Sequence, residues 1–107
     1  MLDKLRLEES LTSNDKKTVI DALMEMVFNA DVIEIKWVVE KLIDLTTHSD
    51  EDVRGLAVTS FGHVARLYHT LGHYNRVTNL LEQIKNDPLI GGRAQDALED
   101  IEIYLRE

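Results

Sequence analysis

The feature that most constrains this chain is a pattern of apolar and small residues that occurs twice at the same spacing. The first copy starts at Val53 and the second at Ile90, 37 residues later. The positions that match in type are Val53, Ala57, Ser60, Phe61 and Val64 in the first copy, and Ile90, Ala94, Ala97, Leu98 and Ile101 in the second. Steps of three and four residues place each set on one side of a helix. A repeat of this length is typical of helix pairs that bury their apolar faces against one another.

The first copy lies in the stretch 50–71, which we expect to be the central helix. Asp50-Glu51-Asp52 is an acidic start, where carboxylates accept hydrogen bonds from free N–H groups and favour the positive end of the helix dipole. Gly55, Thr59 and Gly62 then form a line of small residues. Such a line could admit a ligand, although close approach of a neighbouring helix is its commoner use.

The rest of the chain also shows helical periodicity, and we predict an all-α protein. The expected helices cover 2–9, 15–28, 32–47, 51–70, 74–86, and from 89 or 92 to 106. Leu2, Leu5 and Leu7 form the apolar side of the first helix. In the helix 32–47, Val32 and Ile35 are expected to face inward, while Ile33 and Trp37 fall on the polar side. The short links predict antiparallel helix pairs.

These motifs resemble a known repeat family. Asp52-Val53-Arg54-x-x-Ala57 with Phe61-Gly62-x-Val64 is similar to the start of a HEAT-like repeat, and the segment from Asp87 to Leu98 is similar to the next start. The resemblance covers about 15–106. It implies a short HEAT-like α-solenoid of antiparallel helix pairs, with about two and a half repeats and five to six helices in a single domain, 1–107.

Composition limits the classes of function. A net charge of −8 argues against direct nucleic-acid binding, which needs clustered Lys and Arg. Residues 1–52 and 94–107 hold most of the acidic excess, which suits a basic partner, although acidic surfaces also serve solubility. There is no cysteine and no long apolar run, so we expect a cytoplasmic protein without disulfides or a membrane span.

The sequence offers little chemistry for catalysis. His69 and His73 have a spacing that metal ligands use, but Gly72 stands between them and no cysteine or nearby carboxylate completes the set. Gly91-Gly92 could bind an anion at a helix start, although a turn is the simpler use. No phosphate-binding loop, nucleophile elbow or dinucleotide motif is present. We therefore predict no catalytic residue, no metal, no cofactor and no enzymatic activity.

Two faces are candidate partner-binding surfaces. On the helix 32–47, the only tryptophan, Trp37, falls among acidic residues of the polar face, and an aromatic residue ringed by charge is typical of binding hot spots. The alternative is that Trp37 packs against an adjacent helix. The last helix carries the second candidate face, with Ile103 among carboxylates. The predicted partner-binding residues are Glu34, Trp37, Glu40, Asp44, Asp96, Glu99, Asp100 and Ile103.

A short, acidic, helical-repeat chain also resembles the immunity proteins of bacterial polymorphic toxin systems, including contact-dependent growth inhibition. That resemblance is to a general type of protein and not to a particular short motif. It implies an immunity protein that binds one cognate toxin domain, one-to-one, and occludes its active site. A basic nuclease would fit the acidic charge. The alternative is a generic HEAT-like adaptor, or a scaffold similar to phycobilisome lyases, with an unrelated partner.

Overall fold

The computed structural model describes residues 3–105, which form seven helices and no strand. The helices are α1 (Lys4–Leu11), α2 (Lys16–Phe28), α3 (Ala30–Ile33), α4 (Ile35–Leu45), α5 (Glu51–Tyr68), α6 (Tyr74–Ile84) and α7 (Gly91–Tyr104). The all-α prediction is confirmed. No helix in this part of the chain has the length and apolar character needed to cross a bilayer.

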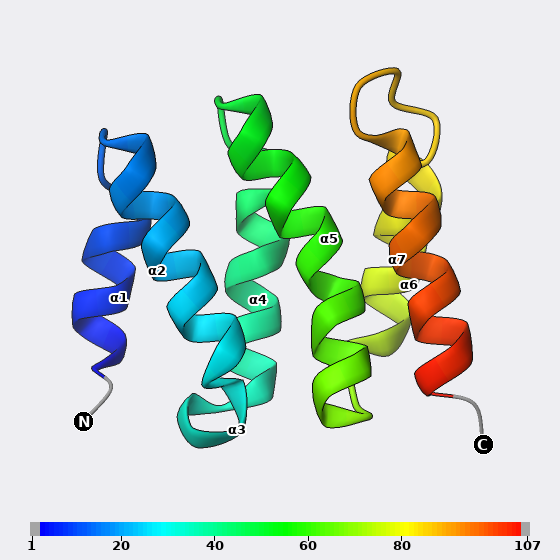
Figure 1. The fold of residues 1–107 in the computed structure, drawn as a ribbon, viewed down its shortest axis with the longest axis horizontal. Coiled ribbons are helices and arrows are strands. Elements are labelled where there is room, and N and C mark those ends of the chain that lie inside the picture. The colour runs from blue at the N-terminus through cyan, green and yellow to red at the C-terminus, as the bar shows by residue number, and fades with distance from the viewer. Residues whose placement is uncertain (1–2, 106–107) are drawn as a thin grey trace.

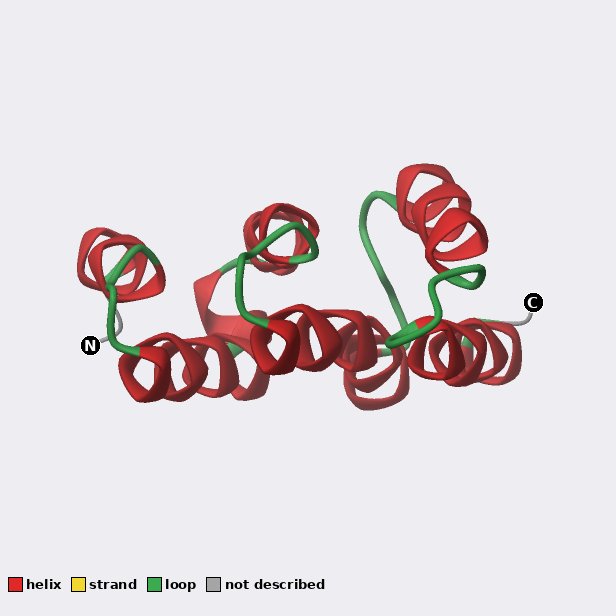
Figure 2. Ribbon diagram, turned by 90° about the horizontal axis from the view of Figure 1, so that it is seen from above, coloured by secondary structure: helices red, strands yellow, loops and turns green. Residues whose placement is uncertain are grey.

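The long helices form two layers (Figures 1 and 2). α2, α5 and α7 lie side by side in one layer, with α5 in the centre, and α1, α4 and α6 form the second layer. α5 packs closely against both α2 and α7, whereas α1, α4 and α6 stand apart from one another. The molecule is correspondingly flat, with extents of 34 × 31 × 17 Å. We call the side formed by α2, α5 and α7 the front face, because it faces the viewer in Figure 1.

Aspartates cap the starts of α2 and α5 and the turn that precedes α7. Asp15 accepts a hydrogen bond from the N–H of Thr18, and Asp50 accepts from Asp52 and Val53. Asp87 accepts from two N–H groups in the turn that leads into α7. These bonds satisfy donors that a helix start leaves without partners. For Asp50, burial acts to raise the pKa, but the two N–H groups and the nearby Lys16 outweigh it and lower the pKa.

Small residues bring α5 and α7 together, as the line of Gly55, Thr59 and Gly62 suggested. A Cβ atom at Gly62 would stand 2.6 Å from the Asp100 carboxylate and 3.3 Å from the Ala97 Cα. At Gly55 a Cβ would stand 2.8 Å from the Arg93 Nε. Side chains of α7 therefore occupy the space that the glycines leave open. Ala57 and Ala94 are both fully buried, which agrees with their predicted contacts in the core.

The prediction of five or six helices was wrong, because the expected helix 32–47 is two helices. Glu34 adopts φ 156° and ψ 115°, which interrupts the backbone between α3 and α4. The break changes which side chains face the core. Val32, expected inside, is 72% exposed, whereas Ile33, expected outside, packs against the core.

The first helix was predicted with the wrong limits, and of its predicted apolar side Leu7 is buried as expected whereas Leu5 is not. α1 covers 4–11, and its buried residues are Leu7 and Leu11, while Leu5 is 64% exposed. Leu2 lies outside the described residues. Asp3 begins the helix by accepting a hydrogen bond from the N–H of Leu5, and this signal moves the start past the predicted one.

Candidate partner-binding surfaces

Trp37 lies between α1 and α4, where two lysines cover its ring. The Lys4 and Lys41 ammonium nitrogens stand 5.5 and 5.3 Å from the ring centroid, within the range of cation–π attraction. The indole is half-buried and packs against the core. Trp37 was predicted either to anchor a partner or to pack against an adjacent helix, and this arrangement favours the second role.

The acidic residues around Trp37 are partly neutralised by the same lysines. Lys4 forms a 2.8 Å salt bridge with Glu34 and lowers its pKa, and Lys41 forms a 3.0 Å salt bridge with Glu8. Glu40 contacts His73 at 3.2 Å. Asp44 is exposed at the end of a hollow of about 460 Å³ between α1 and α4. α4 belongs to the layer whose helices stand apart from one another.

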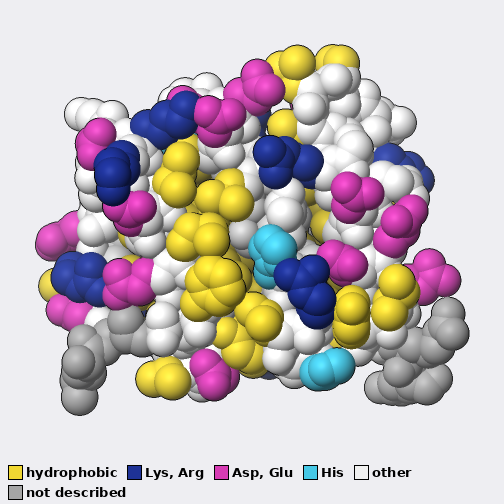
Figure 3. Space-filling model, in the orientation of Figure 1, with side chains coloured by type: hydrophobic (Ala, Val, Ile, Leu, Met, Phe, Trp, Pro, Cys, Tyr) yellow, Lys and Arg dark blue, Asp and Glu magenta, His cyan; other side chains and the backbone are white. Residues whose placement is uncertain are grey.

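The last helix carries the second predicted face. Asp96, Glu99 and Ile103 are exposed, and Ile103 is 62% accessible. Neither Asp96 nor Glu99 forms a salt bridge with any residue between 3 and 105. Figure 3 shows acidic side chains on the α7 side of the front face. Carboxylates without a cationic partner keep their charge available to a basic surface.

Asp100 differs from the other acidic residues predicted on this helix. It was predicted as a partner-binding residue, but it is only half-exposed and lies against Gly62 of α5. Its carboxylate stands 3.9 Å from the Arg66 guanidinium. Asp100 therefore belongs to the seam between α5 and α7 and contributes less free charge than Asp96 or Glu99.

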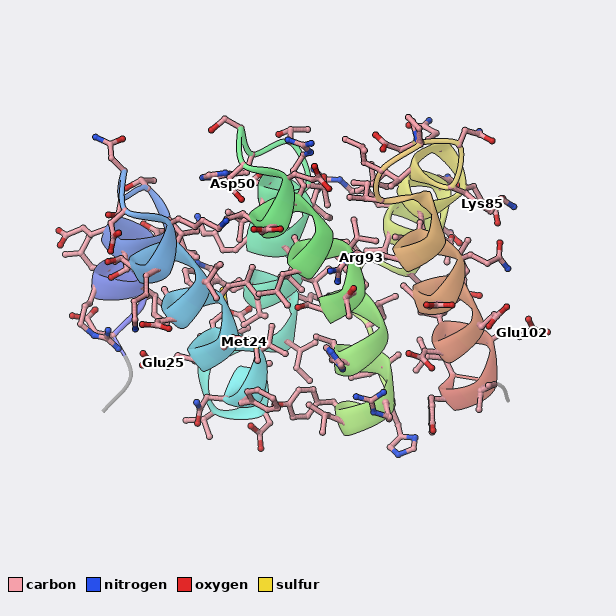
Figure 4. The ribbon with its side chains drawn as sticks, turned by 45° about the horizontal axis from the view of Figure 1, so that its top comes forward. Met24, Glu25, Asp50, Lys85, Arg93 and Glu102 are labelled. Atoms are coloured by element: carbon pink, nitrogen blue, oxygen red, sulfur yellow. The ribbon has the colours of Figure 1, made fainter. Side chains whose placement is uncertain are left out.

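A third feature, which the sequence reasoning missed, is an apolar strip on the front face between α2 and α5. We define the α2/α5 strip as Ile20, Met24, Phe28, Leu56 and Leu67. Phe28 is 57% exposed and Leu67 is 43% exposed, while the other three are half-buried. Figure 3 shows hydrophobic side chains gathered between these helices, and Figure 4 places Met24 in the same seam. The four-residue spacing of Ile20, Met24 and Phe28 could have indicated it.

The histidines and glycines singled out in the sequence have structural roles. His69 ends α5 in the left-handed conformation, with φ 54°, and its ring lies edge-on to Tyr104. Among the described residues, no group of three or more His, Cys, Asp or Glu is placed to hold a metal ion. Gly91 opens α7, and its N–H donates to the carbonyl of Asp87 at 2.9 Å.

Comparison with known proteins finds a likeness among solved structures. No family model matches the chain, and no curated protein sequence matches it either. Among solved structures, a chain in the crystal structure of a CDI complex from Cupriavidus taiwanensis LMG 19424 has the same fold, with a TM-score of 0.84. It is 25% identical, and the match covers 99% of this chain and 92% of that one. The predicted resemblance to proteins of contact-dependent growth inhibition is confirmed.

Proposed function

We propose that this chain is an immunity protein that binds a cognate toxin domain and neutralises it by occluding the active site. The observation that carries the proposal is the likeness to a chain of the CDI complex, which extends over nearly the whole length of both chains. It acts by binding and not by catalysis, in the cytoplasm, where an incoming toxin would reach its substrate. One immunity protein binds one toxin domain.

The charge of the surface supports a basic partner, which we propose is a nuclease. A nuclease needs a positively charged cleft to hold phosphates, and an acidic protein can occupy that cleft. The net charge here is −8, and α7 offers Asp96 and Glu99 without cationic partners among the described residues. Opposite charges also raise the rate of capture, which matters for an inhibitor that must act before the toxin does.

We rank the α7 face above the α4 face as the toxin contact. On α7, Asp96, Glu99 and Ile103 combine free carboxylates with an exposed apolar side chain, and Asp100 lies beside them. On α4, Glu40 contacts His73, Glu34 contacts Lys4, and Trp37 is covered by lysines, which leaves Asp44 as the freest acid. The two faces lie on opposite layers, so variants that neutralise the acidic residues of one face at a time show which face contacts the toxin.

For the fold, we propose a short HEAT-like α-solenoid in a single domain. In chain order the repeats would be α2 followed by α4 and α5 followed by α6, with α7 beginning a third, while the helices that pack most closely across the layers are α1 with α2, α4 with α5 and α6 with α7. Residues at equivalent places have equivalent burial: Leu23, Ala57 and Ala94 are all fully buried. The first helices of the repeats then form one layer and the second helices the other, which is the arrangement in Figure 2.

The direct test starts from the gene that precedes this chain's gene. We expect its C-terminal domain, produced with this chain, to yield a one-to-one complex, and this chain to rescue cells from growth arrest by that domain. The matched variants are Asp96→Asn with Glu99→Gln, and Glu40→Gln with Asp44→Asn. Loss of rescue in the first pair supports the α7 face. Capture of an unrelated protein from the native host, with no rescue, would favour the adaptor and overturn the proposal.

A further inference from the structure

Ile20, Met24 and Leu56 of the α2/α5 strip pack against the core, whereas Phe28 and Leu67 are exposed and do not belong to the residues that pack on it. The equivalent seam between α5 and α7 lies on the same face, and residues 37 positions apart occupy corresponding places along it. Leu56 corresponds to Arg93, and His63 corresponds to Asp100. Arg93 lies over Gly55 and donates to the Thr59 hydroxyl at 2.9 Å, so this seam is closed by polar side chains. A charged seam therefore suffices to pack two front-layer helices.

Two side chains of the strip, Phe28 and Leu67, are far more exposed than the residues of the core. Other contacts also join the two helices: Lys16 pairs with Asp50 and Asp52, and the Tyr68 hydroxyl donates to the Val27 carbonyl at 2.7 Å. Phe28 and Leu67 have about half of their surface in water. Contiguous exposed apolar side chains rimmed by polar residues mark interaction sites more often than packing sites.

Charge indicates which kind of partner fits the strip. Asp31 lies near its lower end, close enough to Tyr68 that its carboxylate adds to the rise that burial causes in the pKa of that phenol. Asp96 and Glu99 are exposed on α7, which belongs to the same layer, and acidic side chains are visible on the α7 side of the front face in Figure 3. Among residues 3–105, none of Asp31, Asp96 and Glu99 forms a salt bridge. A partner with an apolar segment between lysines or arginines would be complementary to both features.

We propose that the α2/α5 strip is the apolar centre of the toxin-binding surface, and that the acids of α7 and Asp31 form its charged rim. This inference rests on the proposed function. The occupant is the toxin domain, which would place an apolar segment over Met24 and Leu56 and basic side chains toward the rim. Phe28 and Leu67, which are exposed before binding, would become buried in the complex and contribute most to affinity.

The test compares alanine variants of two exposed residues in the strip with alanine variants of two exposed leucines outside it. Phe28→Ala and Leu67→Ala remove side chains that are already exposed, so their thermal unfolding should stay close to that of wild type. Leu5→Ala and Leu89→Ala are matched controls, because both leucines are more than 60% exposed and lie outside the strip. Affinity for the C-terminal domain encoded directly before this gene is measured by calorimetry. We expect a loss of about 30-fold or more in each strip variant and at most about twofold in the controls.

The outcomes separate the two proposals. If wild type does not bind that domain, the proposed function fails. If wild type binds and both strip variants bind within twofold of it, the function stands and the strip is not the contact. If wild type alone is a dimer by light scattering, and Leu67→Ala makes it a monomer without changing toxin affinity, the strip joins two copies of this chain and the inference is overturned.

Discussion

Two adjacent glycines at the start of α7 have different surroundings. A Cβ atom at Gly91 would stand 2.5 Å from the carbonyl oxygen of Lys85, which is backbone and cannot move aside cheaply. A Cβ atom at Gly92 would meet nothing within 4 Å. Gly91→Ala should therefore cost about 1–3 kcal/mol through overpacking. Gly92→Ala should stabilise the fold by about 0.4–1 kcal/mol, because alanine has less conformational freedom in the unfolded chain.

Chemical denaturation of the two variants measures this difference directly. Equal stability of Gly91→Ala and Gly92→Ala would mean that the turn between α6 and α7 does not approach Gly91 as described. The sequence identified the pair as a turn or an anion site but could not separate the two residues, because the clash involves a carbonyl six residues away.

His63 makes folding stability depend on pH. Burial lowers its pKa, and the Arg66 guanidinium, which donates to the His63 Nδ1 atom, lowers it further, while the Asp100 carboxylate acts in the opposite direction. The pKa is therefore lower in the folded state than the unfolded value of about 6.5. Below that value the unfolded chain binds more protons, so stability should fall as the pH drops from about 7 to 5.

The His63→Gln variant isolates this contribution, since glutamine keeps polarity but does not titrate. Melting temperatures of the two proteins, measured between about pH 5 and 8, should diverge toward acid, with wild type losing more. Parallel curves would show that His63 has the same pKa in the folded and unfolded states.

At the scale of single elements, the sequence predicted most helices and the close approach of a neighbouring helix to the small residues of α5, but it missed what depends on distant residues, including that this neighbour is α7. The periodicity of 51–70 and the small residues within it are local, so both could be read from the chain. The break at Glu34 could be suspected only from β-branched Val32, Ile33 and Ile35, which are mediocre helix formers. Lys41 lies four residues after Trp37 on the same helix, but Lys4 could not be paired with the ring from the sequence, because it comes from another helix.

Ala57 tests whether α5 is the packed centre of the fold. Its side chain is fully buried, and the interior around it is close-packed. Ala57→Leu should force neighbouring helices apart and cost about 1–3 kcal/mol. Thermal unfolding would detect this as a lower melting temperature. An unchanged midpoint would place residue 57 toward solvent and the register of α5 in error.

Two measurements on the Trp37→Ala variant, its stability and its affinity for the toxin domain, test the role of this side chain. Because the indole packs between α1 and α4 beneath Lys4 and Lys41, Trp37→Ala should lower the free energy of unfolding. The loss should exceed about 1 kcal/mol, since cation–π contacts contribute about 0.5–1 kcal/mol each and buried aromatic area adds to them. Affinity for the toxin domain should remain within about twofold in the folded fraction.

The opposite pattern would restore the α4 face as the main contact. A Trp37→Ala variant with unchanged stability and an affinity loss of about 2 kcal/mol would show that the ring fills a pocket of the partner, as hot-spot residues do. Lys41→Gln is a second variant for comparison, because it removes one cation from above the ring and leaves the indole in place.

At the scale of the whole molecule, layer geometry decides which residues can act together. α2, α5 and α7 present one face, so the α2/α5 strip and the acids of α7 can contact one partner at the same time. Glu40 and Asp44 lie on α4, in the other layer. The sequence could place each residue on a side of its own helix, but which helices share a layer follows from packing between distant segments.

Net charge predicts how the complex should respond to salt. This chain carries −8, and a basic toxin domain would be drawn to it over distances comparable to the Debye length, about 10 Å at 0.1 M salt. The association rate constant should therefore fall steeply between low and physiological ionic strength, while the dissociation rate changes little. Stopped-flow measurements over a series of salt concentrations give the slope. The Asp96→Asn and Glu99→Gln double variant should associate more slowly at low salt, and its association rate should depend less steeply on salt, because both carboxylates face solvent without a salt-bridge partner among the described residues.

The Glu40→Gln and Asp44→Asn double variant has the same net charge as that variant, and the salt dependence of its association rate should stay closer to that of wild type. Equal slopes for the two variants would mean that the total charge steers the encounter and that no particular face does, and a rate constant indifferent to salt would remove charge complementarity as the basis of recognition.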